Sequence, residues 1–351
     1  VGMEISSLEE FDARLIELDG TKNKKNFGAN IILSLSLAFC KLSASKEKKP
    51  LYQFIYDYFL EHFSSKIEMK MPLPMMNILN GGAHANNKLD FQEFMIQPVG
   101  FSSFKEGLIC GVEVFNYLKK TLNQKGFSTA VGDEGGFAPG IDSAEEALDL
   151  ISSSIEAAGY KVDKDVTFAL DCAATELLSK DKYVFSNDEK LSSDELIEYL
   201  AKLANAYPLT SIEDGLDEND WSGWEKLTKK LGKKTQLVGD DLFVTNKEIL
   251  QEGIDRSVAN SILVKINQIG TISETLQTIN LAYQHNYSCV ISHRSGETED
   301  NFIADLAVGT GAGQIKTGAP SRSDRTSKYN RLLMIDAMED LNFLGRQELA
   351  N

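Results

Sequence analysis

The stretch QLVGDDLFVTNKEILQEGIDRSVANSILVKI, residues 236–266, contains two short apolar runs, and each of them leads into a charged residue. The first run leads to Asp240 and the second to Lys265, about 25 residues later, which is a typical spacing for one βα unit. Short apolar runs between polar, glycine-containing segments are typical of strands buried on both faces. The stretch therefore predicts two neighbouring parallel strands of an α/β protein.

The same pattern extends outward from this stretch in both directions. Apolar runs with polar or charged ends occupy 74–79, 91–96, 166–171, 209–214, 236–241, 261–266, 289–293 and 314–316. From residue 213 onward the run ends follow one another at about 23 to 28 residues, so each interval fits one βα unit. We expect a TIM-type (β/α)8 barrel whose functional residues lie at the carboxyl ends of the strands. A doubly wound open sheet is the alternative, but no GxGxxG follows any of these runs.

Residues 1–65 show no strand pattern and are expected to form helices. Helix starts are predicted near Ser7, near Gly28 and at Pro50, and Asp19-Gly20 is expected to end the first helix. Further along the chain, Ser143 and Ser192 each precede a glutamate at capping-box spacing. The chain is therefore divided into a helical part, residues 1–65, and a barrel domain, residues 66–351.

Composition excludes several classes of protein. The 351 residues carry a formal charge of −16 and a sequence pI of about 4.8, which disfavours sequence-independent nucleic-acid binding. The longest apolar stretch, 31–39, is far shorter than the roughly 20 residues that span a bilayer. Four cysteines lie far apart without a CxxC pair, which indicates reduced thiols in a cytoplasmic compartment and excludes a disulfide framework or a zinc site.

Three carboxylates follow successive strands and are candidates for a metal site. Asp171, Glu213 and Asp240 each end an apolar run, so a barrel would bring them to one rim. An all-oxygen ligand set suits Mg²⁺ better than zinc. Each residue singly is better explained as a helix N-cap or a turn residue, but three in register favour the metal.

Two lysines end strands that otherwise consist of Ile, Leu and Val. Lys265 and Lys316 would lie near each other and near the metal, so we expect mutual depression of their pKa values, leaving one as a neutral base. Structural ion pairing with the three carboxylates is the competing explanation. Glycine turns at Gly270 and Gly318 favour catalysis, because they let a ligand approach the backbone.

Further polar residues suggest an anionic substrate and acid–base chemistry. The segment His293-Arg294-Ser295 offers a guanidinium fork and a hydroxyl, a combination that suits phosphate. Glu134 lies in the glycine-rich loop GDEGGFAP and is a candidate general acid. The remaining candidates are Gln92 and Glu93 in FQEFMI and His84 in a glycine loop; a lone histidine is more often structural than catalytic.

Taken in order, these segments are similar to the signature segments of the enolase family. They are NGGAHANN, FQEFMIQP, GDEGGFAP, ALDCAATE, IEDGLDENDW, GDDLFVTN, LVKINQIG, SHRSGETED and QIKTGAPSRSDR. The resemblance implies a lyase that dehydrates 2-phosphoglycerate to phosphoenolpyruvate in glycolysis, with two Mg²⁺ per active site. It also implies a homodimer or higher homo-oligomer in the cytoplasm, and a modified barrel preceded by the helical remnant of an α+β N-terminal domain.

The resemblance assigns a role to each candidate residue. Lys265 would remove the C2 proton, while Glu134 would help the 3-hydroxyl to leave with Glu93 as its partner. Lys316 would hold the substrate carboxylate. Arg294 and Ser295 would bind phosphate, and His84, Gln92 and His293 would contact the substrate. The first Mg²⁺ would be bound by Asp171, Glu213 and Asp240.

The chain departs from the family at its start. Enolases have an N-terminal strand-rich portion with a mobile serine-bearing loop, which is not found before Glu4. We therefore expect impaired turnover and exposed apolar side chains on the helices of residues 1–65. Two other functions remain open. One is a related acid dehydratase that binds no phosphate, and the other is a binding or surface protein that keeps the fold without catalysis.

Overall fold

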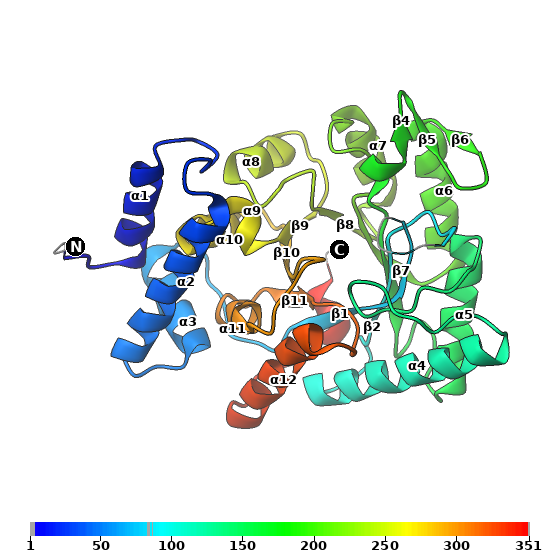
Figure 1. Cartoon of the computed structure of the whole chain (residues 1–351), viewed down its shortest axis with the longest axis horizontal. Coiled ribbons are helices and arrows are strands. Elements are labelled where there is room, and N and C mark those ends of the chain that lie inside the picture. Colours follow the sequence, from blue (N-terminus) through cyan, green and yellow to red (C-terminus); the bar gives the residue numbers. More distant parts are fainter. Residues whose placement is uncertain (1–3, 83–84, 86, 350–351) are drawn as a thin grey trace.

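The computed structural model describes residues 4–82, 85 and 87–349 of the chain, as helices around a central barrel (Figure 1). The N-terminal part contains α1 (Leu8–Asp19), α2 (Ala29–Lys46) and α3 (Leu51–His62). The barrel strands are β1 (Leu73–Asn80), β2 (Glu93–Gln97), β3 (Thr167–Asp171), β7 (Leu209–Glu213), β8 (Gln236–Gly239), β9 (Ser261–Val264), β10 (Ser288–Ser292) and β11 (Gly313–Lys316).

Further helices surround these strands, and a small sheet lies apart from the barrel (Figure 1). The helices are α4 (Phe104–Gln124), α5 (Ala144–Ala157), α6 (Ser193–Ala206), α7 (Trp221–Leu231), α8 (Lys247–Asp255), α9 (Ile266–Ile269), α10 (Ile272–Gln284), α11 (Phe302–Gly309) and α12 (Ser323–Met338). The small sheet consists of β4 (Leu178–Ser179), β5 (Lys182–Val184) and β6 (Lys190–Leu191), and two 3₁₀ turns occupy η2 (Ala174–Leu177) and η3 (Gly345–Glu348).

The barrel is closed in the order β1-β11-β10-β9-β8-β7-β3-β2. Neighbouring strands are parallel from β3 through β7 to β11 and on to β1, whereas β2 runs antiparallel to both β1 and β3. The barrel prediction is therefore confirmed, and the doubly wound alternative is wrong. Each of the eight apolar runs became one strand, and the early strands depart from strict βα alternation as the family resemblance implies.

A separate apolar layer fills the barrel interior. It consists of the fully buried Met75, Met95, Ala169, Val238, Leu263 and Val290, contributed by different strands. Nearer the amino ends of the strands, the side-chain amide of Gln236 donates to Gln314 at 2.9 Å and that of Gln314 donates back at 2.8 Å. The interior of the barrel is therefore a packed core and not a pore.

The helix starts follow the predicted caps. The hydroxyls of Ser7, Ser143 and Ser192 each accept a hydrogen bond from the backbone N–H three residues later. A reciprocal capping box forms only at Ser192, where Glu195 also accepts from the Ser192 backbone N–H. At Ser143 the corresponding glutamate, Glu146, accepts from Asp142 N instead. The local sequence signals therefore locate these starts to within one residue.

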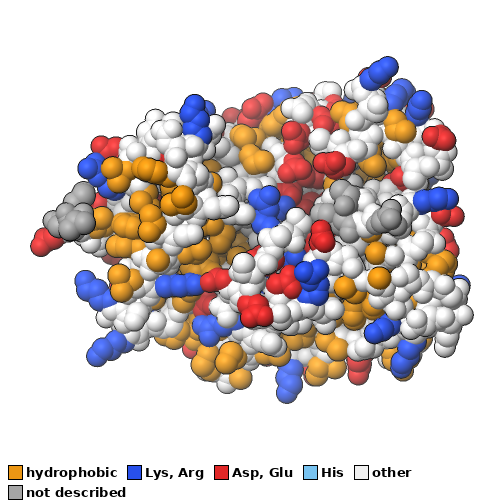
Figure 2. Space-filling model, in the orientation of Figure 1, with side chains coloured by type: hydrophobic (Ala, Val, Ile, Leu, Met, Phe, Trp, Pro, Cys, Tyr) orange, Lys and Arg blue, Asp and Glu red, His pale blue; other side chains and the backbone are white. Residues whose placement is uncertain are grey.

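Helices α1 to α3 lie to one side of the barrel, and α3 contacts α11 (Figure 1). The expected exposure of apolar side chains in this part is confirmed: Ile31 is 58% exposed, Leu35 44% and Leu42 65%. Figure 2 shows hydrophobic side chains gathered over this region, while acidic side chains lie nearer the centre of the same face. All three residues lie on α2.

The cysteines lie in the hydrophobic core of the folded chain. All four cysteines are free and buried. Burial raises the pKa of both the Cys40 and the Cys110 thiol to about 12, which makes these thiols poor nucleophiles. Within the described ranges, no helix is both long enough and apolar enough to cross a membrane.

Candidate active site at the carboxyl rim of the barrel

Strand register places three carboxylates at one level of the rim. Glu93 on β2 pairs with Asp171 on β3, and Asp171 pairs in turn with Glu213 on β7. The side chains of these residues are nearly inaccessible to solvent. Three buried carboxylates side by side repel one another strongly, so the fold requires positive charge among them.

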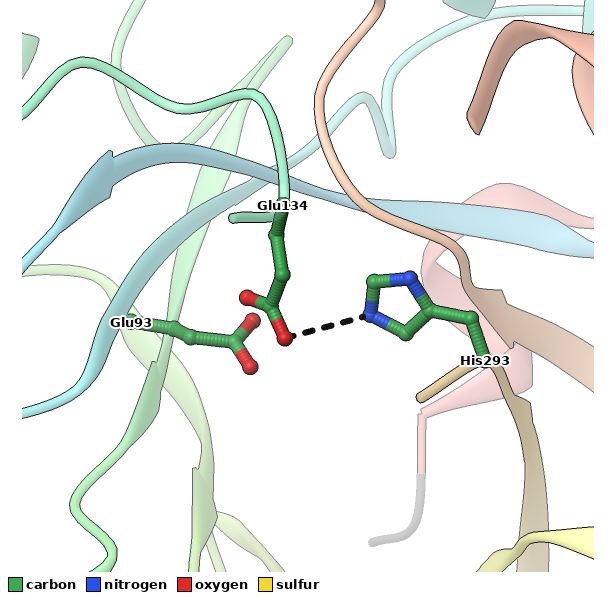
Figure 3. A group of neighbouring side chains, drawn as sticks. All are labelled: Glu93, Glu134 and His293. Carbon is green, nitrogen blue, oxygen red and sulfur yellow. Dashed lines mark ion pairs between the residues drawn. The ribbon is translucent and has the colours of Figure 1, made fainter. Parts of the chain in front are cut away.

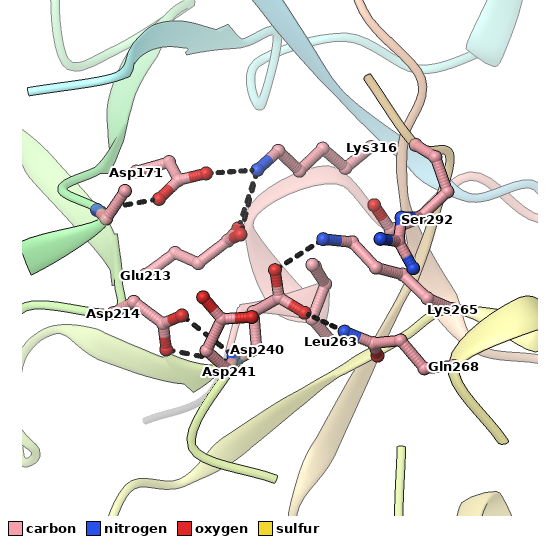
Figure 4. A network of polar contacts seen from close by, with 12 residues as sticks. Asp171, Glu213, Asp214, Asp240, Asp241, Leu263, Lys265, Gln268, Ser292 and Lys316 are labelled. Carbon is pink, nitrogen blue, oxygen red and sulfur yellow. Dashed lines mark hydrogen bonds and ion pairs between the residues drawn. The ribbon is translucent and has the colours of Figure 1, made fainter. Parts of the chain in front are cut away.

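Lys316 supplies that charge from β11 (Figure 4). Its Nζ lies 3.0 Å from Glu93 Oε1 and 2.9 Å from Asp171 Oδ2. The same Nζ lies 2.9 Å from both carboxylate oxygens of Glu213. Burial by itself would lower the pKa of Lys316, but the surrounding carboxylates outweigh it and raise the pKa well above its usual value.

Lys265 follows β9 directly as the N-cap of the short helix α9. Its ammonium contacts Asp240, whose other carboxylate oxygen accepts a hydrogen bond from Gln268 Nε2 at 3.0 Å. Burial lowers the pKa of Lys265, but Asp240 and Glu213 outweigh burial and raise it. The expected depression of the lysine pKa values is therefore wrong for this structure. The carboxylates beside each ammonium raise its pKa by more than burial lowers it. The competing explanation from the sequence, ion pairing between the lysines and the carboxylates, describes the arrangement in this structure.

Asp214 fixes the turn that carries Asp240. Its carboxylate accepts from the backbone N–H groups of Asp240 at 2.9 Å and Asp241 at 2.8 Å. Burial and the neighbouring aspartates raise the pKa of Asp214 well above its usual value. Asp214 was not among the predicted residues, although the paired acids of SIED and GDD were a signal for it.

Glu93, Glu134 and His293 form a second group at the rim (Figure 3). His293 Nε2 lies 3.7 Å from Glu134 Oε1, and Asn77 Nδ2 donates to Glu134 Oε2 at 2.7 Å. Burial raises the pKa of Glu93 well above its usual value, and the charge of Glu134 adds to this effect. The arrangement favours a proton held between two close carboxyl groups. Asn77 was not predicted, because an asparagine within an apolar strand has no distinctive sequence signal.

Most of the predicted residues line one cavity of about 80 Å³. Its lining consists of Gln92, Glu93, Glu134, Asp171, Lys265, Ser292, His293, Arg294, Ser295 and Lys316. Gln92 Nε2 donates to Asp171 Oδ2 at 3.4 Å, and Arg294 Nη1 donates to Asn267 Oδ1 at 3.1 Å. Predicted His84 lies outside the described residues. Glu213 and Asp240 are not part of this lining, but each pairs with a lysine that is.

The acidic groups at the rim could bind a metal ion. Among the described residues, two sets bring three ligand atoms within 4.8 Å of one another: Glu93, Glu134 and His293, and Asp214, Asp240 and Asp241. The predicted set of Asp171, Glu213 and Asp240 is not one of them, since Lys316 and Lys265 occupy the space beside these carboxylates. Oxygen donors that already surround one cation fit a hard divalent ion.

A closed barrel with cations and carboxylates gathered around a cavity at the carboxyl rim defines an enzyme of the TIM-barrel class. Comparison with known proteins is more specific. Residues 1–55 match the family model of the enolase N-terminal domain, and residues 68–350 match that of the enolase C-terminal TIM barrel domain. The chain belongs to the enolase family, whose members are lyases.

Individual relatives agree with the family models. The chain is 54% identical over 349 residues to proteins named enolase from the Lens, Corby and Paris strains of Legionella pneumophila. Each alignment covers 99% of this chain and 81% of the relative.

Proposed function

We propose that this chain catalyses the Mg²⁺-dependent dehydration of 2-phosphoglycerate to phosphoenolpyruvate. The observation that carries the proposal is the shared cavity, which combines a lysine, Lys265, a buried carboxyl group, Glu134, and the guanidinium of Arg294. Elimination of water requires a base at one carbon, an acid at the next and a site for the anionic groups. Family membership supports the same reaction.

Lys265 would act as the base and Glu134 as the acid. In the proposed reaction the C2–H bond breaks and Lys265 takes the proton, while the electron pair is delocalised into the substrate carboxylate and forms the C2–C3 double bond only as the C3–O bond breaks. The C3–O bond then breaks, and the hydroxyl leaves as water with a proton from Glu134. Glu93 lies in the same buried group as Glu134 and would assist by holding a shared proton before the reaction.

The other cavity residues would bind and orient the substrate. Lys316, held among three carboxylates, would pair with the substrate carboxylate. Arg294 and Ser295 would bind the phosphate, because guanidinium and hydroxyl groups match its oxygens. Gln92, His293 and His84 would complete the contacts. Fixing the substrate in this way places the C2 proton at Lys265.

Asp171, Glu213 and Asp240 would hold the first of two Mg²⁺ ions. The oxygen-only donor set fits this ion, and the ammonium of Lys316 between Asp171 and Glu213 indicates that the site stabilises positive charge. When bound, Mg²⁺ supplies charge that stabilises the negative charge developing on the substrate, a pattern already established for the enolase superfamily. With Asp240 engaged by the metal, Lys265 would lose the charge that raises its pKa, could release its proton to solvent, and would then act as a neutral base.

The experiment follows phosphoenolpyruvate by its ultraviolet absorbance in the presence of 2-phosphoglycerate and MgCl₂. Exchange of the substrate C2 proton with deuterated solvent is measured in parallel, because exchange requires the base alone. We expect Lys265→Ala to abolish both signals, and Glu134→Gln to abolish product formation while retaining exchange. Lys230→Ala is the control, since this lysine forms a surface ion pair with Glu198 in which both side chains are more than a third exposed. Equal exchange in wild type and Lys265→Ala would refute the assignment of the base.

We also propose a homodimer or higher homo-oligomer, located in the cytoplasm. Family resemblance supports self-association, and exposed apolar residues such as Ile31 and Leu42 on α2 provide surface that association would bury. Buried free thiols suit a reducing compartment. Sedimentation velocity over a range of concentrations tests the oligomeric state, and a monomer at all concentrations would contradict it.

A further inference from the structure

Arg325 lies beside the proposed active site, although neither the sequence motifs nor the proposed reaction assigns it a role. It belongs to the first turn of α12 and is fully buried, at 0% exposure. An arginine is almost never buried so completely without fixed partners. Its contacts therefore indicate what it does.

The guanidinium joins two loops of the cavity. Nη1 donates to the carbonyl of Arg294 at 2.7 Å, and Nη2 donates to the carbonyl of Ser295 at 2.7 Å. Nη2 also donates to the carbonyl of Asp133 at 3.1 Å, in the loop that carries Glu134. Nε lies 3.1 Å from Asp324 Oδ2. A rigid fork with several donors can hold both loops in one arrangement, which a lysine cannot do.

The neighbouring backbone leaves space for this side chain. Gly318, just beyond β11, has a φ of +82°, and a Cβ built there would lie 2.8 Å from Arg325 Cδ. The carbonyl of Gly318 accepts from the Tyr329 hydroxyl at 2.6 Å, which fixes the turn. Arg325 is thus accommodated by a position that only glycine fills without strain.

The remaining contact of Arg325 determines the chemistry of His293. Nη1 also contacts His293 Nδ1. Because a guanidinium has no acceptor atom, Nδ1 must accept, and the proton of a neutral imidazole must then lie on Nε2. Burial, with a further contribution from the charge of Arg325, lowers the pKa of His293 well below 6.5 and so favours the neutral ring. Nε2 has no hydrogen-bond partner among the described residues, and His293 lines the cavity.

We propose that Arg325 is a positioning residue that holds His293 as the Nε2–H tautomer, so that His293 donates a hydrogen bond to an oxygen of the substrate beside Glu134. The identity of that substrate rests on the proposed function, whereas the tautomer does not. A donor held in place before the substrate binds stabilises developing negative charge without reorganisation. Arg325 would therefore influence turnover without touching the substrate.

The tautomer can be measured on the full chain without turnover. The chain has four histidines, so long-range ¹H–¹⁵N correlation spectra of the ¹⁵N-histidine-labelled protein can be assigned with a His293→Gln variant. We expect a protonated Nε2 and an unprotonated Nδ1 at His293, and a mixture of tautomers in Arg325→Met, which has no donor for Nδ1. A protonated Nδ1 in the wild type, or an unchanged tautomer in the folded variant, would overturn the proposal.

Activity assays test the consequence for catalysis. Arg325→Met should lower kcat by about 100-fold while KM changes by less than about threefold, because a wrong tautomer removes a donor used in the transition state. Arg256→Met is the control, since Arg256 forms surface ion pairs with Glu225 and Glu252 and contacts none of the cavity residues in these pairs. It should retain full activity. An equal loss of kcat in the two variants would count against the proposal.

Replacement of His293 itself provides a test that leaves Arg325 intact. A glutamine amide nitrogen can occupy the position of Nε2, whereas an asparagine amide nitrogen occupies that of Nδ1. We therefore expect His293→Gln to be at least about tenfold more active than His293→Asn. Equal activities would refute the proposed donor. A wild-type chain without turnover would refute the proposed function instead, and the tautomer measurement would still decide the role of Arg325.

Discussion

Lys316 and Glu213 lie on strands that are not neighbours in the barrel, yet the ammonium of one lies 2.9 Å from both carboxylate oxygens of the other. Lys316 therefore reaches across the rim and acts as an internal counter-ion for carboxylates from β2, β3 and β7. Removal of one partner from a buried ionic cluster leaves uncompensated charge, which is costly.

We predict that Lys316→Met lowers the free energy of unfolding by about 3–5 kcal/mol in metal-free buffer. Urea denaturation in the presence of EDTA measures the loss, and MgCl₂ should restore part of it by supplying other positive charge. Lys226→Met is the control, because Lys226 forms an exposed pair with Asp194 and should leave stability nearly unchanged. An undiminished stability for Lys316→Met would contradict the counter-ion role.

A second prediction concerns the pH dependence of stability. The pKa of His293 is lowered well below 6.5 by burial, so the unfolded chain takes up a proton there while the folded chain does not. Stability should fall as the pH decreases from 6.5 toward the folded-state pKa, with a contribution of about 1.4 kcal/mol per pH unit.

Urea denaturation between pH 7.5 and pH 5 measures this slope as a difference between variants. His293→Gln should lose the contribution of one proton, and exposed His285→Gln should retain it. If the slopes of wild type and His293→Gln were identical, His293 would be protonated as readily in the folded chain as in the unfolded one.

A third prediction separates steric contact from backbone strain at glycine. Gly318 and Gly126 have φ values of +82° and +78°, but an added Cβ lies 2.7 Å from the Glu134 carbonyl oxygen at Gly318 and meets nothing within 4 Å at Gly126. Alanine should therefore cost about 1 kcal/mol at Gly126 from strain alone, and about 1–3 kcal/mol more at Gly318. Thermal or urea unfolding of the two variants provides the comparison, and equal losses would show that the loop adapts.

A fourth prediction concerns the thiols. All four cysteines are buried, and burial raises the pKa of Cys40 and Cys110 to about 12. The native chain should therefore react with a disulfide reagent such as Ellman's reagent only as fast as it unfolds. Denatured protein should react completely, with four thiols per chain. Rapid modification of the native protein would show that one cysteine becomes accessible in a locally open state.

The barrel strands and several site residues could be predicted because their signals are local. Asp171, Glu213 and Lys316 each end a buried apolar run, and a barrel brings such ends to one rim by geometry alone. The capping box of Ser192 and Glu195, which spans only four residues, predicts the start of its helix. In these cases one segment of sequence contains all the information that the prediction needs.

The remaining features depend on contacts between distant segments. The charge state of Lys265 depends on whether an acid or another lysine lies nearest, and Asp240 lies 25 positions away in sequence. Arg325 belongs to a polar helix start that resembles any solvated surface, yet its partners come from loops near residues 133 and 294. Such roles cannot be predicted from one segment of sequence, because the fold determines which distant residues lie beside it.

The barrel closes between its first and last strands, since β1 pairs with β11 through Leu73 and Gln314. During synthesis, β1 leaves the ribosome long before β11, so the nascent chain must carry two unpaired strand edges until almost all of it has been made. Lys316 is synthesised with this last strand, so the carboxylates on β3 and β7 have no ammonium partner from Lys316 until then. Closure of the barrel and neutralisation of its rim therefore belong to one late event in folding. A chain released before residue 313 would keep its strand edges unpaired and would be prone to aggregate.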